Sequence, residues 1–230
     1  MEAASYPAPS VATPDSTFMT KVFGWMFLGL LISGIVAGVI GQSDSLLTDL
    51  TDSPWLLIGI FVLQIGLVIT ISAAINRLSP ALALGLFFLY AATVGVTFAL
   101  VFELYTAQSI FTTFLITSAM FGGVALWGYV TKRDLSTMGT VLFMALIGLI
   151  LASVVNLFLA NEAIYWITTY AGVVIFAGLT AYDMQKIKGF AQAGLEGDAE
   201  DRAAIMGALA LYLDFINLFL FLLRIFGQRR

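Results

Sequence analysis

The sequence predicts an all-α integral membrane protein whose chain crosses the bilayer seven times. The first observation is composition: of 230 residues, 60% are hydrophobic and 10% are charged, and the mean hydropathy is +1.00. A soluble domain carries roughly 25% charged residues. The second observation is that the apolar residues gather into seven runs, each close to the length of about 20 residues that spans a bilayer.

The seven runs account for nearly all of the chain after residue 20. They lie near Val22–Gly41, Pro54–Asn76, Pro80–Phe102, Ser109–Thr131, Leu135–Ala160, Ala163–Tyr182 and Ala203–Phe226. The connections are short except Asp183–Arg202, which predicts one compact seven-helix domain over residues 21–230. Residues 1–20 are polar and hold three of the five prolines, so a disordered cytoplasmic tail is expected there.

Two helix starts carry recognisable capping residues. Ser79 precedes Pro80, which predicts an N-cap followed by proline at the first helical position, where its missing N–H costs nothing. Ser136 in RDLSTMG is predicted to cap the fifth helix in the same way. Gly34 and Gly38 have the spacing of a face for close helix contact; glycines that are merely tolerated in a membrane helix are an equal alternative.

The residue types that are missing limit the chemistry of the chain. It has no cysteine and no histidine, which excludes disulfides, Cys/His zinc sites and Ser-His-Asp catalysis. The net charge of −4 argues against nucleic acid as a partner. Any site must therefore use carboxylates, Lys or Arg, hydroxyl groups or the backbone.

The distribution of basic residues predicts a cytoplasmic N-terminus. With that orientation, the cytoplasmic segments hold Lys21, Arg77, Lys132, Arg133, Lys186, Lys188 and Arg202, while the opposite loops hold no basic residue. Arg224, Arg229 and Arg230 conflict with this pattern, because seven spans place them outside. Either they are an accepted exception or the last run is re-entrant and the C-terminus is cytoplasmic; we favour seven complete spans.

Asp214 most needs an explanation, because it stands inside the apolar run ALYLDFINLFLFLLRIFG. A carboxylate at the centre of a membrane helix costs several kcal/mol. Asp214 lies about 16 Å along its helix from Ala203, and Asp183 ends the preceding run. The two carboxylates are therefore expected to meet in the cytoplasmic half of the bundle, where Arg77 ends the second run.

Two close carboxylates have predictable behaviour in a medium of low dielectric constant. Both cannot ionise cheaply, so the pair is expected to share one proton, and the titration belongs to the pair. Loss of that proton leaves a repulsion that separation, Arg77 or a divalent cation relieves. Calcium takes oxygen ligands, including carboxylates, although spacing alone does not select calcium.

The segments GLTAYDMQKIK and LYLDFINLFLFLLRIFG closely resemble the Bax inhibitor-1 family, and MFGGVALWGYVTKRDLS resembles its bacterial members. The resemblance covers the chain from about Thr20 onwards. It implies a seven-helix bundle with the last helix central, located in the bacterial inner membrane, and a calcium leak controlled by pH. The family's paired aspartates map onto Asp183 and Asp214, with Tyr182 and Asn217 as neighbouring polar residues, and its basic latch maps onto Arg77.

Three functions remain in competition. The favoured one is a pH-sensitive calcium leak whose aspartate pair binds the ion; calcium and protons are the expected ligands, and no other cofactor is expected. The alternative is a regulator that transports nothing and binds another membrane protein, such as a membrane protease. An intramembrane aspartyl protease is disfavoured, because its second aspartate requires a neighbouring glycine and Asp214 lies in LYLDF, so no enzymatic activity is expected.

Overall fold

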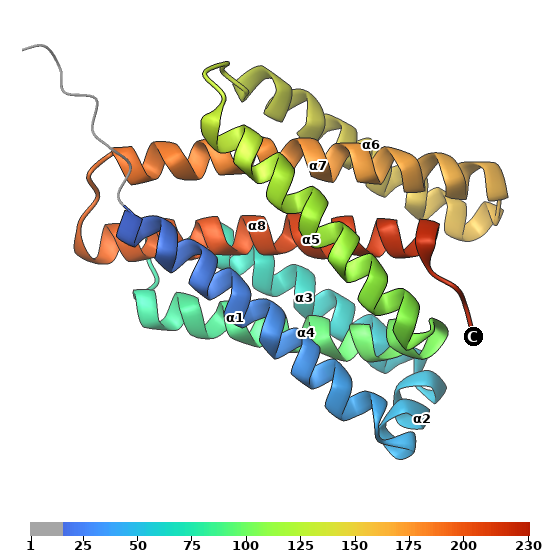
Figure 1. The fold of residues 1–230 in the computed structure, drawn as a ribbon. Helices are drawn as coiled ribbons and strands as arrows, with labels where there is room; N and C mark the ends of the chain where they lie inside the picture. The colour runs from blue at the N-terminus through green and yellow to red at the C-terminus, as the bar shows by residue number, and fades with distance from the viewer. Residues whose placement is uncertain (1–15) are drawn as a thin grey trace, which may run out of the picture.

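The computed structural model describes residues 16–230, which form eight α-helices (Figure 1). Seven of them are long and apolar enough to cross a membrane, and no strand is assigned in this part of the chain, so the predicted fold class is confirmed. The helices are α1 (Ser16–Gly41), α2 (Asp44–Asp52), α3 (Pro54–Ala74), α4 (Pro80–Leu104), α5 (Ala107–Val130), α6 (Ser136–Leu159), α7 (Glu162–Gln192) and α8 (Gly197–Phe226).

The last helix, α8, occupies the centre of the bundle. Within its most apolar stretch, 67% of the residues are buried, compared with 6% for α6. Figure 1 shows α1 and α5 crossing in front of α8, α4 below it and α7 running alongside it. A polar side chain in this buried stretch of α8 therefore needs a partner inside the protein.

Helix α1 begins earlier than the sequence predicted. The expected tail ended at Thr20, but the helix starts at Ser16, and the hydroxyl of Thr20 donates to the Ser16 carbonyl at 2.8 Å. Phe18 is 1% exposed, so packing of its ring holds this first turn in the bundle. The prediction of a tail is wrong for residues 16–20; residues 1–15 lie outside the described part.

The prediction of a long loop over Asp183–Arg202 is also wrong. Helix α7 continues to Gln192 and α8 begins at Gly197, so a short turn separates them. Gly194 has φ of 63°, a conformation that glycine adopts without steric cost at a helix end. The extension is amphipathic, because Met184 and Ile187 are buried and alternate with charged residues of the same helix. Those charges lower the local hydropathy, so the apolar run appeared to end at Tyr182.

A short helix was missed in the connection between the first two spans. Helix α2 is nine residues long, and the hydroxyl of Ser43 accepts a bond from the backbone N–H of Leu46 at 3.5 Å. Leu50 is buried beneath it. The segment is too short and too acidic to read as a span, which is why only a loop was predicted.

The two predicted caps have different outcomes. Ser79 is the N-cap of α4 and accepts from the N–H of Leu82 at 3.3 Å, with Pro80 in the first turn, as predicted. Ser136 is not a cap: it is the first residue of α6, and its own N–H donates to the Asp134 carboxylate at 2.9 Å. The Asp134 carboxylate, rather than the Ser136 hydroxyl, therefore accepts a hydrogen bond from a free backbone N–H at the beginning of α6.

Close helix contacts form at glycines other than those the sequence suggested. A Cβ on Gly34 or Gly38 would meet nothing within 4 Å, whereas one on Gly139 would lie 2.6 Å from the ring of Tyr182. A Cβ on Gly128 would collide with the backbone of Ala181. These two glycines let α5 and α6 approach the part of α7 that carries Asp183.

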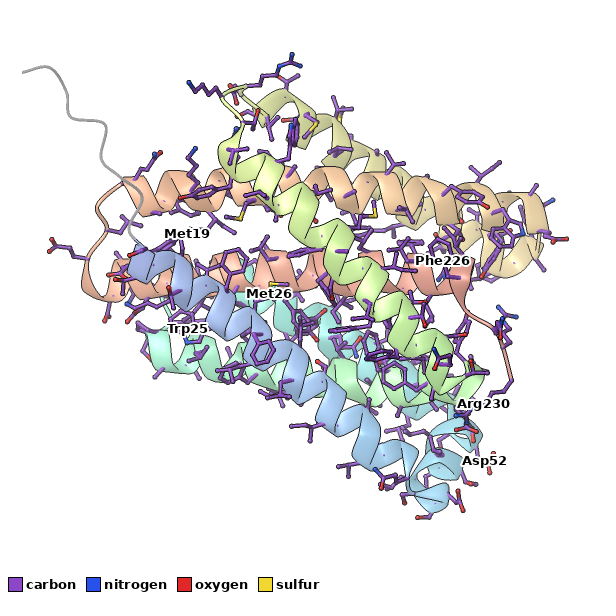
Figure 2. The ribbon with its side chains drawn as sticks, in the orientation of Figure 1. Met19, Trp25, Met26, Asp52, Phe226 and Arg230 are labelled. Carbon is purple, nitrogen blue, oxygen red and sulfur yellow. The ribbon has the colours of Figure 1, made fainter. Side chains whose placement is uncertain are left out.

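The chain ends on the side opposite the turn between α7 and α8. Figure 2 shows Phe226 and Arg230 at the same end of the bundle as Asp52, with Met19 at the other end. The segment after α8 pairs with the α4–α5 connection, where the N–H of Thr106 donates to the Gln228 carbonyl at 3.1 Å. The re-entrant alternative is therefore wrong, and α8 crosses the bundle completely.

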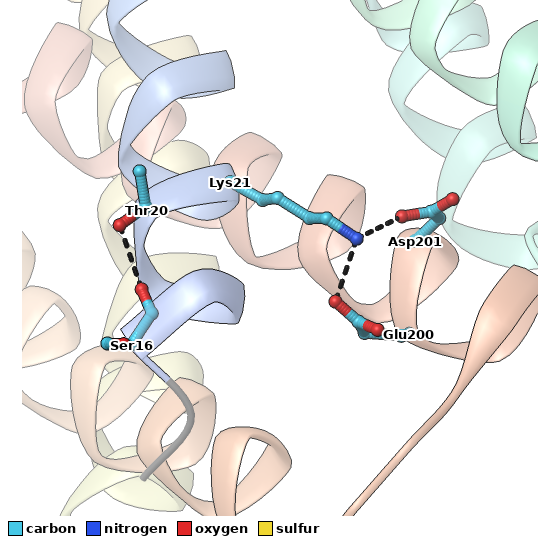
Figure 3. Close-up of polar contacts among 5 residues, drawn as sticks. All are labelled: Ser16, Thr20, Lys21, Glu200 and Asp201. Carbon is cyan, nitrogen blue, oxygen red and sulfur yellow. Dashed lines mark hydrogen bonds and ion pairs between the residues drawn. The ribbon is translucent and has the colours of Figure 1, made fainter.

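At the opposite end, an ionic contact ties the first helix to the central one. The Lys21 ammonium group lies 2.8 Å from Glu200 and 2.9 Å from Asp201 (Figure 3). All three side chains are partly exposed, so the contact contributes modestly to stability. It fixes the beginning of α1 against the beginning of α8.

Candidate functional site

The structure brings together the two carboxylates that the sequence singled out. Asp183 lies on α7 and Asp214 on α8, and their side chains are within hydrogen-bonding distance of each other. The two helices are antiparallel neighbours joined by a short turn. A hydrogen bond between two carboxyl groups requires one proton, so this geometry fits a pair that shares one.

Asp214 is the buried member of the pair. It is 4% exposed, and its Oδ2 atom has no hydrogen-bond partner among the described residues. The hydroxyl of Thr180, which donates to the Phe176 carbonyl at 2.7 Å, also interacts with the Asp214 carboxyl. A buried oxygen without a partner is costly, and a proton or a cation would relieve that cost.

The pair faces a groove on the side of the bundle. A cavity of about 1050 Å³ between α3, α6, α7 and α8 is lined by both aspartates, Tyr182, Asn217 and Lys186. Apolar side chains that line the groove are exposed, such as Phe143 (60%) and Leu157 (80%), so the groove opens to the surface of the bundle. In a membrane these side chains face lipid, so the acid pair lies at the side of a lateral opening.

Tyr182 and Asn217 line the same groove in different ways. The ring of Tyr182 packs against Gly139 of α6, which holds α6 close to α7. The side-chain amide of Asn217 donates to the Leu213 carbonyl at 2.8 Å. Because an amide oxygen is a suitable calcium ligand, Asn217 offers a third type of oxygen donor to the groove.

Lys186, rather than Arg77, is the cation that acts on Asp183. Lys186 lies three residues after Asp183 on α7, close enough to interact with its charge. Arg77 is exposed in the turn between α3 and α4 and forms no ion pair with any described residue. The predicted contact between Arg77 and Asp183 is therefore absent from this structure, because Arg77 lies on the outside of that turn.

The donor set suits a cation that stays partly hydrated. Calcium takes six to eight oxygen ligands, and the residues of the groove nearest the pair in sequence offer two carboxyl groups, the Tyr182 hydroxyl and the Asn217 amide. Within residues 16–230, no group of three or more acidic residues is placed to hold a metal ion. A cation at this site would keep several water ligands, which is a property of a weak or transient site.

Sequence reasoning missed Thr180 and underrated Lys186. Both lie three residues from Asp183, on opposite sides of it in the sequence, so all three share one face of a helix. That spacing is readable from the sequence, provided that the helix is known to continue past Tyr182. The sequence indicated that the helix continues past Tyr182 towards Lys188, but no role was assigned to Thr180 or Lys186 from that spacing.

Comparisons with known proteins place the chain in a family. The model of the family described as "Inhibitor of apoptosis-promoting Bax1" matches residues 15–230. The "Inner membrane protein YbhL" of Escherichia coli K12 is 50% identical over 219 residues, covering 93% of this chain and 92% of that protein. A protein of Borreliella burgdorferi is 44% identical over 215 residues and one of Deinococcus radiodurans is 40% identical over 213, each covering 93% of this chain and 92% and 91% of the relative. The chain therefore belongs to the Bax inhibitor family of membrane proteins.

Proposed function

We propose that this protein is a pH-sensitive calcium leak, and that the Asp183–Asp214 pair controls both its opening and its selectivity for the ion. One observation carries the proposal: a buried carboxylate with an unpartnered oxygen faces a second carboxylate beside an open groove. Ionisable residues inside a membrane protein are costly and usually mark an ion or proton pathway. The family resemblance of the sequence motifs points to the same ion and the same pair.

Protons and calcium compete for the same oxygens in this mechanism. When the pair holds one proton, the two carboxyl groups share a hydrogen bond and α7 stays against α8. When the proton leaves, two negative charges face each other, and either a cation neutralises them or the helices separate. Calcium affinity therefore falls as pH falls, because metal binding requires deprotonated ligands.

A leak fits this site better than a storage site. Conduction requires binding that is strong enough to admit the ion and weak enough to release it. The groove supplies few protein oxygens, so the ion would retain water and exchange quickly. Calcium is thus the transported ion rather than a resident cofactor.

We place the protein in the bacterial inner membrane with a cytoplasmic N-terminus. YbhL, half of whose aligned residues are identical to this chain, is named an inner membrane protein. The end of the bundle that holds Lys21 also holds Lys132 and Arg133, in the turn between α5 and α6, and Arg202, near the beginning of α8. Positively charged turns remain on the cytoplasmic side of membrane proteins.

The proposal assigns no enzymatic step to the acid pair. Asp214 lies between Leu213 and Phe215 and is itself among the buried residues of α8. Peptide hydrolysis between two aspartates needs room for a substrate backbone and a water molecule. Asp214 is 4% exposed, so little of its carboxyl group is open to a peptide backbone, and we assign the pair to an ion instead.

Calcium flux into liposomes that contain the purified protein, measured across a pH series, tests the proposal. Wild-type flux should depend on pH, and Asp183→Asn and Asp214→Asn should each abolish that dependence. The double variant should resemble the single variants, because residues that act as one unit are not additive. Asp134→Asn is the matched control: it removes a carboxylate from an exposed loop and should leave the response unchanged.

Folding of each variant is checked by its thermal unfolding in detergent before flux is compared. If folded Asp214→Asn protein retained wild-type calcium flux and its full pH response, the leak proposal would be wrong. A regulator that binds another membrane protein would then be the better conclusion, since neutralising the pair would leave its binding surface intact.

A further inference from the structure

Two arginines lie together at the end of the bundle where α8 finishes. Arg224 is in the last turn of α8, and Arg229 follows in the C-terminal segment. Both line a pocket of about 580 Å³ with Tyr105, Tyr165 and Trp166. The Arg224 guanidinium lies 5.6 Å from the centre of the Tyr165 ring, and the Arg229 guanidinium interacts with the side chains of Tyr105 and Tyr165.

Neither guanidinium is neutralised by a carboxylate of the described chain. Arg230, the neighbouring arginine, pairs with Glu103 at 3.6 Å, but Arg224 and Arg229 form no ion pair with residues 16–230. Glu162 also lines the pocket, beyond ion-pair distance from both. The pocket therefore carries a net positive charge, and the aromatic rings hold its two cations in place.

The pocket continues into the lateral groove beside the acid pair. Arg224 lines both cavities, and the groove runs from it past Phe221 and Asn217 to Asp214. Arg224 and Asp214 are ten residues apart, about 15 Å along α8. Half of a hydrocarbon core of about 30 Å is the same length, so an acyl chain whose headgroup is at Arg224 would reach the acid pair.

We propose that this site binds an anionic phospholipid, with its phosphate group between Arg224 and Arg229 and one acyl chain in the groove. Guanidinium groups match phosphate oxygens in geometry and charge. Tyr105, Tyr165 and Trp166 lie near the end of α4 and the beginning of α7, and amphipathic rings are enriched at the level of the headgroups in membrane proteins. The bound acyl chain covers the lateral opening beside the acid pair. The identity of the lipid headgroup at one membrane surface therefore determines how accessible the acid pair is inside the membrane.

The test is a competition between lipids on the full-length protein in detergent. Phosphatidylglycerol and phosphatidylcholine with identical acyl chains are added together, and native mass spectrometry compares how much of each is retained. We expect wild-type protein to prefer phosphatidylglycerol. An arginine near a membrane surface contributes about 1 kcal/mol to anionic-lipid binding, so Arg224→Gln and Arg229→Gln should each reduce the preference about fivefold and the double variant about twenty-five-fold.

Arg230→Gln is the matched control, because it removes the same charge from a neighbouring arginine that already has a carboxylate partner. Its lipid preference should equal that of wild type. Ser153→Trp, which fills the groove and leaves both arginines in place, should reduce retention of phosphatidylglycerol. Arg224→Lys should retain part of the preference, since a charge remains.

Three results would overturn the proposal. The first is equal retention of both lipids by wild-type protein, and the second is an Arg230→Gln loss as large as that of Arg224→Gln. The third is complete displacement of phosphatidylglycerol by millimolar inorganic phosphate, which would make free phosphate the ligand. Unchanged retention of phosphatidylglycerol in Ser153→Trp would show that the acyl chain does not lie in the groove, and would overturn that part of the proposal.

Discussion

At the scale of single residues, the position of Lys186 gives the clearest consequence for the acid pair. Its ammonium group interacts with Asp183 and favours the charged form of the carboxyl group. Lys186→Gln removes this favourable interaction with the ionised carboxylate, so deprotonation should require a higher pH. The pH midpoint of calcium flux should therefore move to higher pH. The measurement is the same liposome flux assay over a pH series.

Arg77→Gln serves as the comparison for that variant, because it removes one exposed charge on the same side of the bundle. Arg77 has no ion-pair partner among the described residues, so its replacement should leave the midpoint in place. A shift in Arg77→Gln with none in Lys186→Gln would reverse the assignment and restore Arg77 as the cation that controls the pair.

Asp134 provides a second pH effect, which is separate from the pair. Hydrogen bonds from Ser136 lower the pKa of the exposed Asp134 carboxyl below its ordinary value of 3.8. A lowered pKa stabilises the folded protein above the unfolded value, and this contribution disappears as pH falls through the folded value. Wild-type unfolding temperature should thus drop between about pH 4 and pH 2 by more than that of Asp134→Ala.

That comparison isolates the end of α6, because both proteins share every other carboxylate. The surrounding loop is held independently: Gln185 on α7 accepts from the N–H of Leu135 and donates to the Arg133 carbonyl, each at 2.8 Å. Identical pH dependence in the two proteins would mean that Asp134 contributes nothing to stability through its charge.

The acid pair itself was predictable because each aspartate is conspicuous in its apolar surroundings. Asp214 interrupts a long apolar run, and Asp183 follows one, so hydropathy alone singles out both. The partners of the pair were harder to find. The contact with Thr180 and the absence of the Arg77 contact depend on how far α7 extends and how the α3–α4 turn is directed, and neither is encoded in local hydropathy.

At the scale of helices, glycines determine how closely α5 and α6 approach α7. Gly128→Ala would place a Cβ against the backbone of Ala181, two residues before Asp183. Backbone cannot move aside as a side chain does, so the variant should be destabilised by about 1–3 kcal/mol. Thermal unfolding in detergent measures the loss, and the flux assay shows whether the displaced α7 alters the pH response.

Gly123→Ala is the matched control on the same helix, since its Cβ would meet nothing within 4 Å. Alanine has a higher helix propensity than glycine by about 1 kcal/mol, so this variant should be as stable as wild type or slightly more stable. Equal destabilisation of both variants would show that helix conformation, rather than the α5–α7 contact, governs the effect.

The sequence predicted which segments are helices better than where they end. All seven spans were found, because an apolar run of about 20 residues is rare outside membrane helices. The ends of α1, α7 and α8 were missed, because amphipathic turns beyond the membrane contain charges that lower the local hydropathy. The sequence also did not predict which helices are in close contact. Gly34 and Gly38 have the spacing of a contact motif but make no close contact, whereas Gly128 and Gly139 make close contacts but belong to no such motif.

At the scale of the whole molecule, the two ends of the bundle differ in charge and in how they are closed. The end with Lys21 carries most of the basic residues and the contact between α1 and α8 (Figure 3). The other end holds the C-terminal segment, paired with the α4–α5 connection. The exception formed by Arg224, Arg229 and Arg230 is accounted for if these arginines bind Glu103 and lipid phosphate, because they then have local partners.

The orientation of the bundle is testable because the chain has no cysteine of its own. Ser136→Cys and Ala193→Cys place single thiols at exposed positions on the basic end. Gln108→Cys and Ser45→Cys place them at exposed positions on the opposite end. An impermeant thiol reagent added to intact bacteria, after the outer membrane has been made permeable, should label the second pair and leave the first unlabelled until the cells are lysed.

Ala193 is a better site for this experiment than Gly194, whose φ of 63° would strain any side chain placed there. Labelling of both pairs after lysis serves as the control that every thiol is reactive. Labelling of Ser136→Cys and Ala193→Cys in intact cells would show that the orientation in the membrane is the reverse of the one proposed. The acid pair would then open from the outer half of the membrane, and the paired arginines would contact the cytoplasmic leaflet, where anionic lipids attract basic residues.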